Sequence, residues 1–284
     1  MMLSLSLVVL GLSSLVASAD LGISISLPSL LSCGLFPQTS CRNTTVQTDL
    51  CCFNAPGGQL LMTQFWDFSP SAGPSNSWTI HGLWPDHCDG TYDANCDASR
   101  ELSNITQTLK AAKQTTLLSY MNTYWKDQNG NDESFWEHEW NKHGTCISTL
   151  EPKCFKGSRD PTPDVVAYFD KTVSLFQQLP TYLFLAANGI VPDAKKTYTL
   201  AQINNAIKLF TGHIPTAGCT KDGYLSEMWY HYVVQGSVAT GNFIHADPDG
   251  SKSSCPATGI KYVPKGFVKP TTTAAPAPAS TPAA

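Results

Sequence analysis

Charged side chains are scarce in this sequence, and it has no excess of positive charge. Asp, Glu, Lys and Arg make up 14% of its 284 residues, and 18 Lys and Arg stand against 22 Asp and Glu, for a formal net charge of −4. An average soluble domain has about 25% charged residues. Because a protein that coats long nucleic acid needs a basic surface, this composition argues against a general RNA- or DNA-binding protein. It leaves open an enzyme that binds one or two phosphates locally.

The sequence also lacks internal repeats, a glycine-rich phosphate loop and an apolar run long enough for a membrane anchor. Residues 3–16 are apolar, but Asp20 and Pro28 interrupt the next apolar stretch, and a spanning helix needs about 20 apolar residues. An Ala-Ser-Ala motif after the first run is typical of a secretory cleavage site. We therefore interpret residues 1–19 as a signal peptide and residues 20–32 as a propeptide or N-terminal extension, and we expect no membrane anchor.

The far end of the chain has no residues that could form a core. Residues 270–284 are only Thr, Ala, Pro and Ser, which is typical of a disordered tail without the hydrophobic end of a lipid-anchor signal. Asn43 and Asn104 begin N-glycosylation sequons. These features predict a secreted glycoprotein with one domain at residues 33–269. Its destination, extracellular or vacuolar, stays open.

The number of cysteines also indicates the secretory route. Ten cysteines, an even number, predict five disulfides and an oxidising environment. Ten cysteines allow about 945 pairings, so the count leaves the connectivity open. Because none is left over, a catalytic cysteine is not expected.

Hydrophobic periodicity predicts a mixed α+β domain. Buried strands are expected at residues 60–68, 77–81 and 224–234, and helices at residues 117–125 and 135–146 and from residues 163 and 199 onward. Thr199 and Gln202 have the spacing of a capping box. Gly82 and Pro85 are expected to end the second strand, so that His81 would lie at a strand end.

One segment carries most of the candidate chemistry: residues 135–146, Phe-Trp-Glu-His-Glu-Trp-Asn-Lys-His-Gly-Thr-Cys. On a helix at about 100° per residue, one arc of roughly 140° collects, in angular order, His138, Lys142, Phe135, Glu139 and His143. Trp136 and Trp140 flank this arc and are expected to be buried. Glu137 and Asn141 point away, so the pattern favours Glu139 over Glu137 as the working acid.

A zinc site is the first alternative for this helix. Metalloprotease helices place two histidines at i and i+4, so that both imidazoles meet one ion. His138 and His143 are five residues apart, roughly 140° around a helix, and Lys142 would repel a divalent cation. We therefore expect no metal and no other cofactor. The other alternative, a solvated charged face, fits poorly with two tryptophans alongside.

Imidazoles, an ammonium and a carboxylate without a metal pattern suit an anionic substrate whose reaction takes one proton and supplies another. A phosphodiester fits, since Lys or protonated His stabilises charge on phosphate oxygens and His transfers protons near neutral pH. One helix supplies at most one side of an in-line displacement, so a second histidine must come from elsewhere. His81, within Trp-Thr-Ile-His-Gly-Leu-Trp-Pro-Asp at residues 78–86, is the candidate.

Residues 78–86 and 135–146 resemble, in order, the two active-site segments of the ribonuclease T2 family. Residues 87–96, His-Cys-Asp-Gly-Thr-Tyr-Asp-Ala-Asn-Cys, resemble its fungal branch of secreted acid ribonucleases. The resemblance runs roughly from Cys33 to Phe267 and implies a single disulfide-rich α+β domain with helices packed on an antiparallel sheet. The disulfides that it implies are Cys33–Cys52, Cys41–Cys88, Cys51–Cys154, Cys96–Cys146 and Cys219–Cys255.

The family activity implied is endonucleolytic cleavage of single-stranded RNA, in which the 2′-hydroxyl attacks phosphorus to give 2′,3′-cyclic phosphates and then 3′-phosphates. The resemblance implies His81 and His143 as the acid and base pair. We assign His143 as base and His81 as acid, although the sequence does not fix that direction. Glu139 and Lys142 would stabilise the transition state, and His138 would hold the phosphate.

Two base sites are also implied by the resemblance. In the first, Trp84 stacks on the base, Asp86 accepts from an adenine amino group and Tyr92 closes the site. Phe135 and Gln64 would serve the second. Stacking tolerates any base, so we expect low base specificity with an adenine preference, RNA but not DNA as substrate, and a monomer.

Two alternatives from other classes remain beside this hypothesis. A ribonuclease-fold protein that acts mainly through binding would be expected to have lost one of the candidate catalytic residues, and none is lost. A metallohydrolase would be sensitive to chelators.

Overall fold

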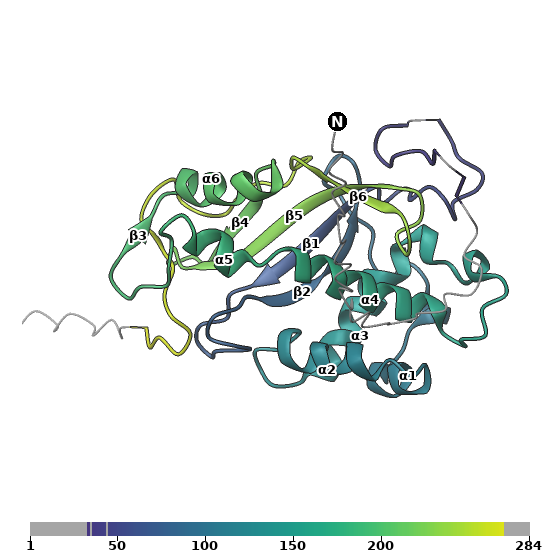
Figure 1. Ribbon diagram of the computed structural model, residues 1–284, viewed down its shortest axis with the longest axis horizontal. Coiled ribbons are helices and arrows are strands. Elements are labelled where there is room, and N and C mark those ends of the chain that lie inside the picture. The colour runs from purple at the N-terminus through teal and green to yellow at the C-terminus, as the bar shows by residue number, and fades with distance from the viewer. Residues whose placement is uncertain (1–32, 35, 44, 270–284) are drawn as a thin grey trace, which may run out of the picture.

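The computed structural model describes residues 33–34, 36–43 and 45–269 (Figure 1). The segments expected to be a signal peptide, an N-terminal extension and a C-terminal tail lie outside the described residues. Among the residues that are described, no helix is long and apolar enough to cross a membrane.

An antiparallel sheet forms the centre of the fold and confirms the predicted α+β class. Its strands are β1 (Gln59–Phe65), β2 (Thr79–Asp86), β4 (Thr216–Cys219), β5 (Leu225–Gln235) and β6 (Asn242–Ala246). The order is β2-β1-β5-β4, and β6 pairs with β5, so β2 is an edge strand. A second small sheet joins β3 (Thr197–Tyr198) to β7 (Ile260–Lys261).

Six α-helices surround the sheet in the described part of the chain. They are α1 (Ile105–Ala111), α2 (Thr115–Tyr124), α3 (Asp132–Lys142), α4 (Pro163–Gln178), α5 (Thr181–Ala186) and α6 (Leu200–Thr211). Figure 1 shows α1, α2 and α3 together beside β2, α4 running across β1 and β2, and α5 and α6 near β4 and β5. Helix α3, which carries most of the candidate catalytic residues, therefore packs at the edge of the sheet formed by β2.

Local signals explain where these helices begin. Pro163 is the first residue of α4, where a missing N–H costs no hydrogen bond. The capping box of Thr199 and Gln202 is present at α6. The predicted helices are confirmed, but α3 starts three residues earlier than expected and ends at Lys142, before His143.

The predicted end of β2 is wrong. The strand continues through Gly82 and Pro85 to Asp86, so His81 lies within it and not at its end. Leu83 N–H points away from β1, because it donates to the Tyr168 hydroxyl. Pro85, two residues on, faces the same way, and an edge strand tolerates proline where no ladder hydrogen bond is due.

The disulfide connectivity implied by the resemblance is confirmed. All ten cysteines are paired, as Cys33–Cys52, Cys41–Cys88, Cys51–Cys154, Cys96–Cys146 and Cys219–Cys255. One bridge ties down the residue two positions after β2, and another the turn after α3. Both segments that carry the candidate residues are thus covalently anchored near an end.

Candidate active site

The N-terminus of α3 is fixed by its own side chains. Asn131 caps the helix by accepting from the Ser134 N–H at 3.2 Å. Asp132 and Glu133 occupy the first turn, where negative charge is favourable. With this start, the helix buries Trp136, Glu139 and Trp140. The predicted orientation of the helix is therefore confirmed at Glu139.

The C-terminus of α3 places His143. Its N–H donates to the Glu139 carbonyl over 3.2 Å, which is the last helical bond. Gly144 follows, and a Cβ there would come within 2.4 Å of the Trp140 ring. Only glycine lets the chain turn this tightly, so His143 is held close to the buried face of α3.

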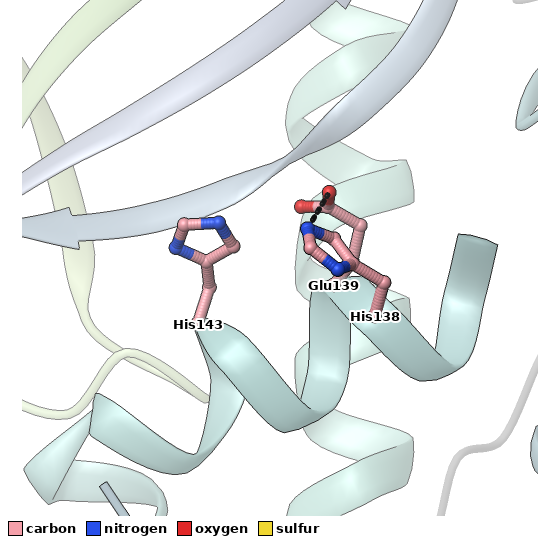
Figure 2. Close-up of side chains that lie close together, drawn as sticks. All are labelled: His138, Glu139 and His143. Carbon is pink, nitrogen blue, oxygen red and sulfur yellow. Dashed lines mark ion pairs between the residues drawn. The ribbon is translucent and has the colours of Figure 1, made fainter. Parts of the chain in front are cut away.

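Glu139, on α3, is fully buried and faces β2. Its Oε1 is 3.5 Å from His81 Nε2 and 4.0 Å from His138 Nε2. Its Oε2 accepts the Trp84 indole N–H at 2.9 Å. The carboxyl group therefore connects β2 with α3, and Figure 2 shows it between β2 and the His138 ring.

The close approach of Glu139 to β2 requires a glycine. A Cβ on Gly82 would lie 1.9 Å from Glu139 Oε2, far inside van der Waals contact. Any side chain at residue 82 would therefore push the carboxyl away from both His81 and Trp84.

Aromatic contacts hold the two histidines. The His143 ring stacks on Trp84, with centroids 4.9 Å apart and planes at 20°. His81 meets the same indole edge-on at 4.6 Å and stacks on Phe65 at 3.8 Å. Among the described residues, His143 Nε2, His81 Nδ1 and Glu139 Oε1 are buried without a hydrogen-bond partner. Unpartnered buried polar atoms are costly, and each of the three candidate residues has one.

Burial sets the protonation of this cluster. Desolvation, reinforced by the nearby histidines and Lys142, lowers the pKa of His81 well below its usual value. Desolvation and Lys142 lower the pKa of His143 to about 3. Desolvation raises the pKa of Glu139 to about 8, against the Trp84 hydrogen bond and Lys142. Near neutral pH all three groups are neutral, so an incoming anion meets no buried carboxylate.

The residues predicted for the first base site lie at or near the C-terminal end of β2. Asp86 is 7% exposed, and burial raises its pKa to about 7. An isolated antiparallel bridge joins it to Tyr92, which is 58% exposed. The Tyr92 ring lies 6.0 Å from Lys142 Nζ. Trp84 lies two residues before Asp86 on the same strand and is half-buried. Its ring stacks on His143 and meets His81 and Trp229 edge-on.

The structure does not support Gln64 as a residue of the second base site. Its side chain is fully buried, and its amide donates to the Leu179 carbonyl at 3.1 Å and accepts from the Thr181 hydroxyl at 2.6 Å. Both ends of the amide are thus bonded inside the core. Successive side chains alternate across a strand, so the next residue, Phe65, faces the site. Strand alternation could have identified Phe65 from the sequence.

Phe135 does line a cavity next to the histidines. The cavity has a volume of about 430 Å³, and Phe65 and Phe135 both line it. Residues 126–129 and Lys269 are also among its lining residues. The ring centroids of Phe65 and Phe135 are 6.3 Å apart. Two aromatic rings at the wall of an open cavity suit a stacked base.

The spacing argument against a metal ion is wrong in its geometry. One ligand atom each from His138, Glu139 and His143 lies within 4.8 Å of the others (Figure 2). A wheel extended through residue 143 overestimates their separation, because α3 ends at Lys142. The argument from charge is unaffected. Besides burial, which is the larger cause, the positive charge of Lys142 lowers the pKa of both histidines, and the same charge would oppose a divalent cation.

Comparison with known proteins matches most of the chain to one family. The family model described as the Ribonuclease T2 family matches residues 35–246. Ribonuclease Trv of Hypocrea rufa is 56% identical over 227 residues, which cover 80% of this chain and 95% of that protein. A ribonuclease T2-like protein of Aspergillus fumigatus is 52% identical over 237 residues, and the match spans 84% of this chain but 58% of that longer protein. The crystal structure of Actibind, a T2 ribonuclease, matches with a TM-score of 0.76 and 49% identity over 81% of this chain and 96% of that one.

Proposed function

The chain belongs to the ribonuclease T2 family, and we propose that it is a secreted endoribonuclease that cleaves single-stranded RNA with His81 and His143 as its proton-transfer pair. The observation that carries this proposal is the convergence of both imidazoles, from separate elements, on the one buried carboxyl of Glu139. Two positioned groups are what a reaction needs when one oxygen loses a proton and another gains one.

His143 is the base that takes the 2′-hydroxyl proton, and His81 the acid that protonates the leaving 5′-oxygen. The two roles exchange when water opens the cyclic phosphate. Both imidazoles are neutral without substrate, because burial and Lys142 lower their pKa values. A bound phosphate opposes that effect and favours an imidazolium. Substrate binding and acidic solution therefore both supply the proton of the acid, and activity is greatest on the acid side of neutrality.

Glu139 acts as a neutral acid. With a pKa of about 8 it is protonated at the working pH, and a carboxylic acid can donate a hydrogen bond to a phosphate oxygen. Its Oε2 accepts from Trp84, which leaves Oε1 for the substrate. Lys142 supplies positive charge to the transition state, and the exposed His138 holds the phosphate.

Two bases bind on either side of the reacting phosphate. The first lies against Trp84 between Asp86 and Tyr92, and the second in the cavity walled by Phe65 and Phe135. Stacking accepts any base, which gives low specificity, while Asp86 favours an adenine amino group.

The catalytic domain occupies residues 33–269, after a signal peptide at residues 1–19 and an extension at residues 20–32. Five disulfides support passage through an oxidising compartment. Asn104 is exposed, so its sequon is accessible to glycosylation. The mature protein works as a monomer, and it needs no metal ion.

The test is to incubate RNA and DNA of one sequence with the protein in excess EDTA. Cleavage of RNA alone, with 2′,3′-cyclic phosphate ends appearing before 3′-phosphates, is expected. The His143→Phe variant in the same buffer controls for a contaminating nuclease. Cleavage of DNA would contradict the 2′-hydroxyl mechanism, and RNA cleavage that EDTA abolishes would favour a metallohydrolase. Tight RNA binding without cleavage would favour a protein that acts by binding.

A further inference from the structure

The buried hydroxyl of Tyr168, on α4, lies where the two catalytic segments meet. It is 3.2 Å from the Leu83 carbonyl and 3.2 Å from the Glu139 carbonyl, and the Leu83 N–H is 3.4 Å from it. One side chain from a third element is therefore within hydrogen-bonding distance of the backbone of both β2 and α3. Tyr168 itself is fully buried.

Each of these backbone groups lies next to a residue of the proposed active site. Leu83 lies between Gly82, where a Cβ would overlap the Glu139 carboxyl, and Trp84, which donates a hydrogen bond to it. The Glu139 carbonyl also accepts the His143 N–H, at 3.2 Å. The hydroxyl thus adjoins the backbone that positions the carboxyl on one side and the histidine on the other.

The neighbours of Tyr168 leave its ring little freedom. Trp140 meets it edge-on with centroids 5.6 Å apart, and Phe169 does so at 5.2 Å. Burial raises the pKa of the hydroxyl well above its usual value, so it keeps its proton at every working pH. Because β2 is an edge strand, its outward N–H and C=O groups have no strand partner, and at Leu83 the hydroxyl takes that place.

We propose that Tyr168 is a positioning residue of the ribonuclease reaction: its hydroxyl fixes β2 against the end of α3 and so sets the distance of His81 from Glu139 and His143. The inference rests on the proposed function. The Glu139 carboxyl and β2 approach each other closely, since His81 Nε2 is 3.5 Å from Glu139 Oε1 and a Cβ on Gly82 would overlap Oε2. Reacting groups that move by about 1 Å can lose 10²-fold in rate.

Tyr168→Phe tests the proposal, because it keeps the packed ring and removes only the hydroxyl. We expect kcat on an adenosine dinucleotide to fall at least about 10-fold with KM within about twofold. Hydrolysis of the 2′,3′-cyclic phosphate should fall in parallel, since the same groups serve both steps. Rates are normalised to the folded fraction, which near-UV circular dichroism gives at the assay temperature.

Tyr198→Phe is the matched control. The Tyr198 hydroxyl is also buried and bonds backbone groups, accepting from the Val191 N–H at 3.1 Å and donating to the carbonyl of the same residue at 2.7 Å. It belongs to β3, far from α3 in Figure 1. The two variants should lose similar amounts of Tm, and only Tyr168→Phe should lose kcat.

Three results would overturn the proposal. These are an unchanged normalised kcat in Tyr168→Phe, an equal loss in Tyr198→Phe, and a Tyr168→Phe chain that fails to fold where Tyr198→Phe folds, since the hydroxyl would then be a requirement of folding. A wild type that does not cleave the dinucleotide would instead reject the proposed function, and with it the positioning role.

Discussion

The indole N–H of Trp84 donates to Oε2 of Glu139 across 2.9 Å, and the same indole stacks on His143. A residue of the proposed first base site therefore contacts both the carboxyl and one histidine of the proposed reaction. A base that stacks on Trp84 would lie against a ring that is already in contact with both groups. In the proposed mechanism, base binding and catalysis are therefore coupled through this one side chain.

Trp84→Phe should separate these two contributions. Phenylalanine keeps a ring for stacking but has no N–H, and that hydrogen bond lowers the pKa of Glu139. Without it the Glu139 pKa rises further and its Oε2 loses a partner, so we expect kcat to fall about 10-fold or more, with a smaller change in KM. Trp78→Phe removes a comparable bond in the core, from an indole to the Tyr262 hydroxyl at 3.0 Å, and should leave the kcat of the folded protein nearly unchanged.

The proposed roles predict which substitutions lower kcat. His81→Phe and His143→Phe should each lower kcat by at least about 10²-fold, the usual effect of removing a positioned acid or base. Glu139→Leu should be clearly impaired, because it removes both the acceptor of the Trp84 N–H and the donor to the phosphate. Glu137→Leu, two residues earlier and half-buried, should retain activity. Equal damage from the two leucine variants in a dinucleotide assay would contradict these roles.

Stability should depend on pH through Glu139. Its pKa is about 8 in the folded protein and 4.5 in a model peptide, so between these values the unfolded chain releases a proton that the folded chain keeps. The stabilisation is complete below pH 4.5 and is lost as pH rises toward 8, by at most roughly 1.4 kcal/mol per pH unit. His143 has the opposite sign, because its lowered pKa makes stability fall as pH drops from 6.5 toward 3.

Urea unfolding at pH 5, 6.5 and 8 measures this effect. The free-energy difference between Glu139→Gln and wild type should shift in favour of the variant as pH rises. Glu137→Gln is the control and should follow wild type. A Glu139→Gln difference that is constant from pH 5 to 8 would show that the buried carboxyl does not titrate in this range.

Much of the site could be predicted from the sequence because local rules govern α3. Periodicity alone selected Glu139 over Glu137 and buried Trp136 and Trp140, as the structure has them. The distance between His138 and His143 could not be obtained in this way. It depends on where the helix stops, at Lys142, and on the close passage of Gly144 over the Trp140 ring, which is a contact in the folded chain.

The other misjudged positions depend on tertiary contacts. Gly82 and Pro85 look like strand breakers, yet here one makes room for the Glu139 carboxyl and the other lies at a sheet edge. Gln64 has a polar side chain that two partners distant in sequence, Leu179 and Thr181, bind inside the core. No window of neighbouring residues contains those partners, so propensity and pattern could not identify them.

The base preference should itself depend on pH, through Asp86. Burial raises the pKa of this carboxyl to about 7. Above pH 7 it is a carboxylate that only accepts hydrogen bonds, so it binds the amino group of adenine and repels the carbonyl of guanine or uracil. Below pH 7 it is a neutral acid that can also donate, so those carbonyl groups are tolerated and the preference weakens. Stacking on Trp84 and Tyr92 accepts every base and does not depend on the titration of Asp86.

The measurement is kcat/KM for dinucleotides that differ only in the first base, between pH 5 and 8. The ratio of adenine to uracil should rise severalfold with pH in the wild type, even though the absolute rates fall. Asp86→Asn, whose amide both accepts and donates at all pH values, should give a ratio that is low and constant. A wild-type ratio that does not change with pH would mean that Asp86 keeps one protonation state, and an unchanged ratio in Asp86→Asn would remove Asp86 from base recognition.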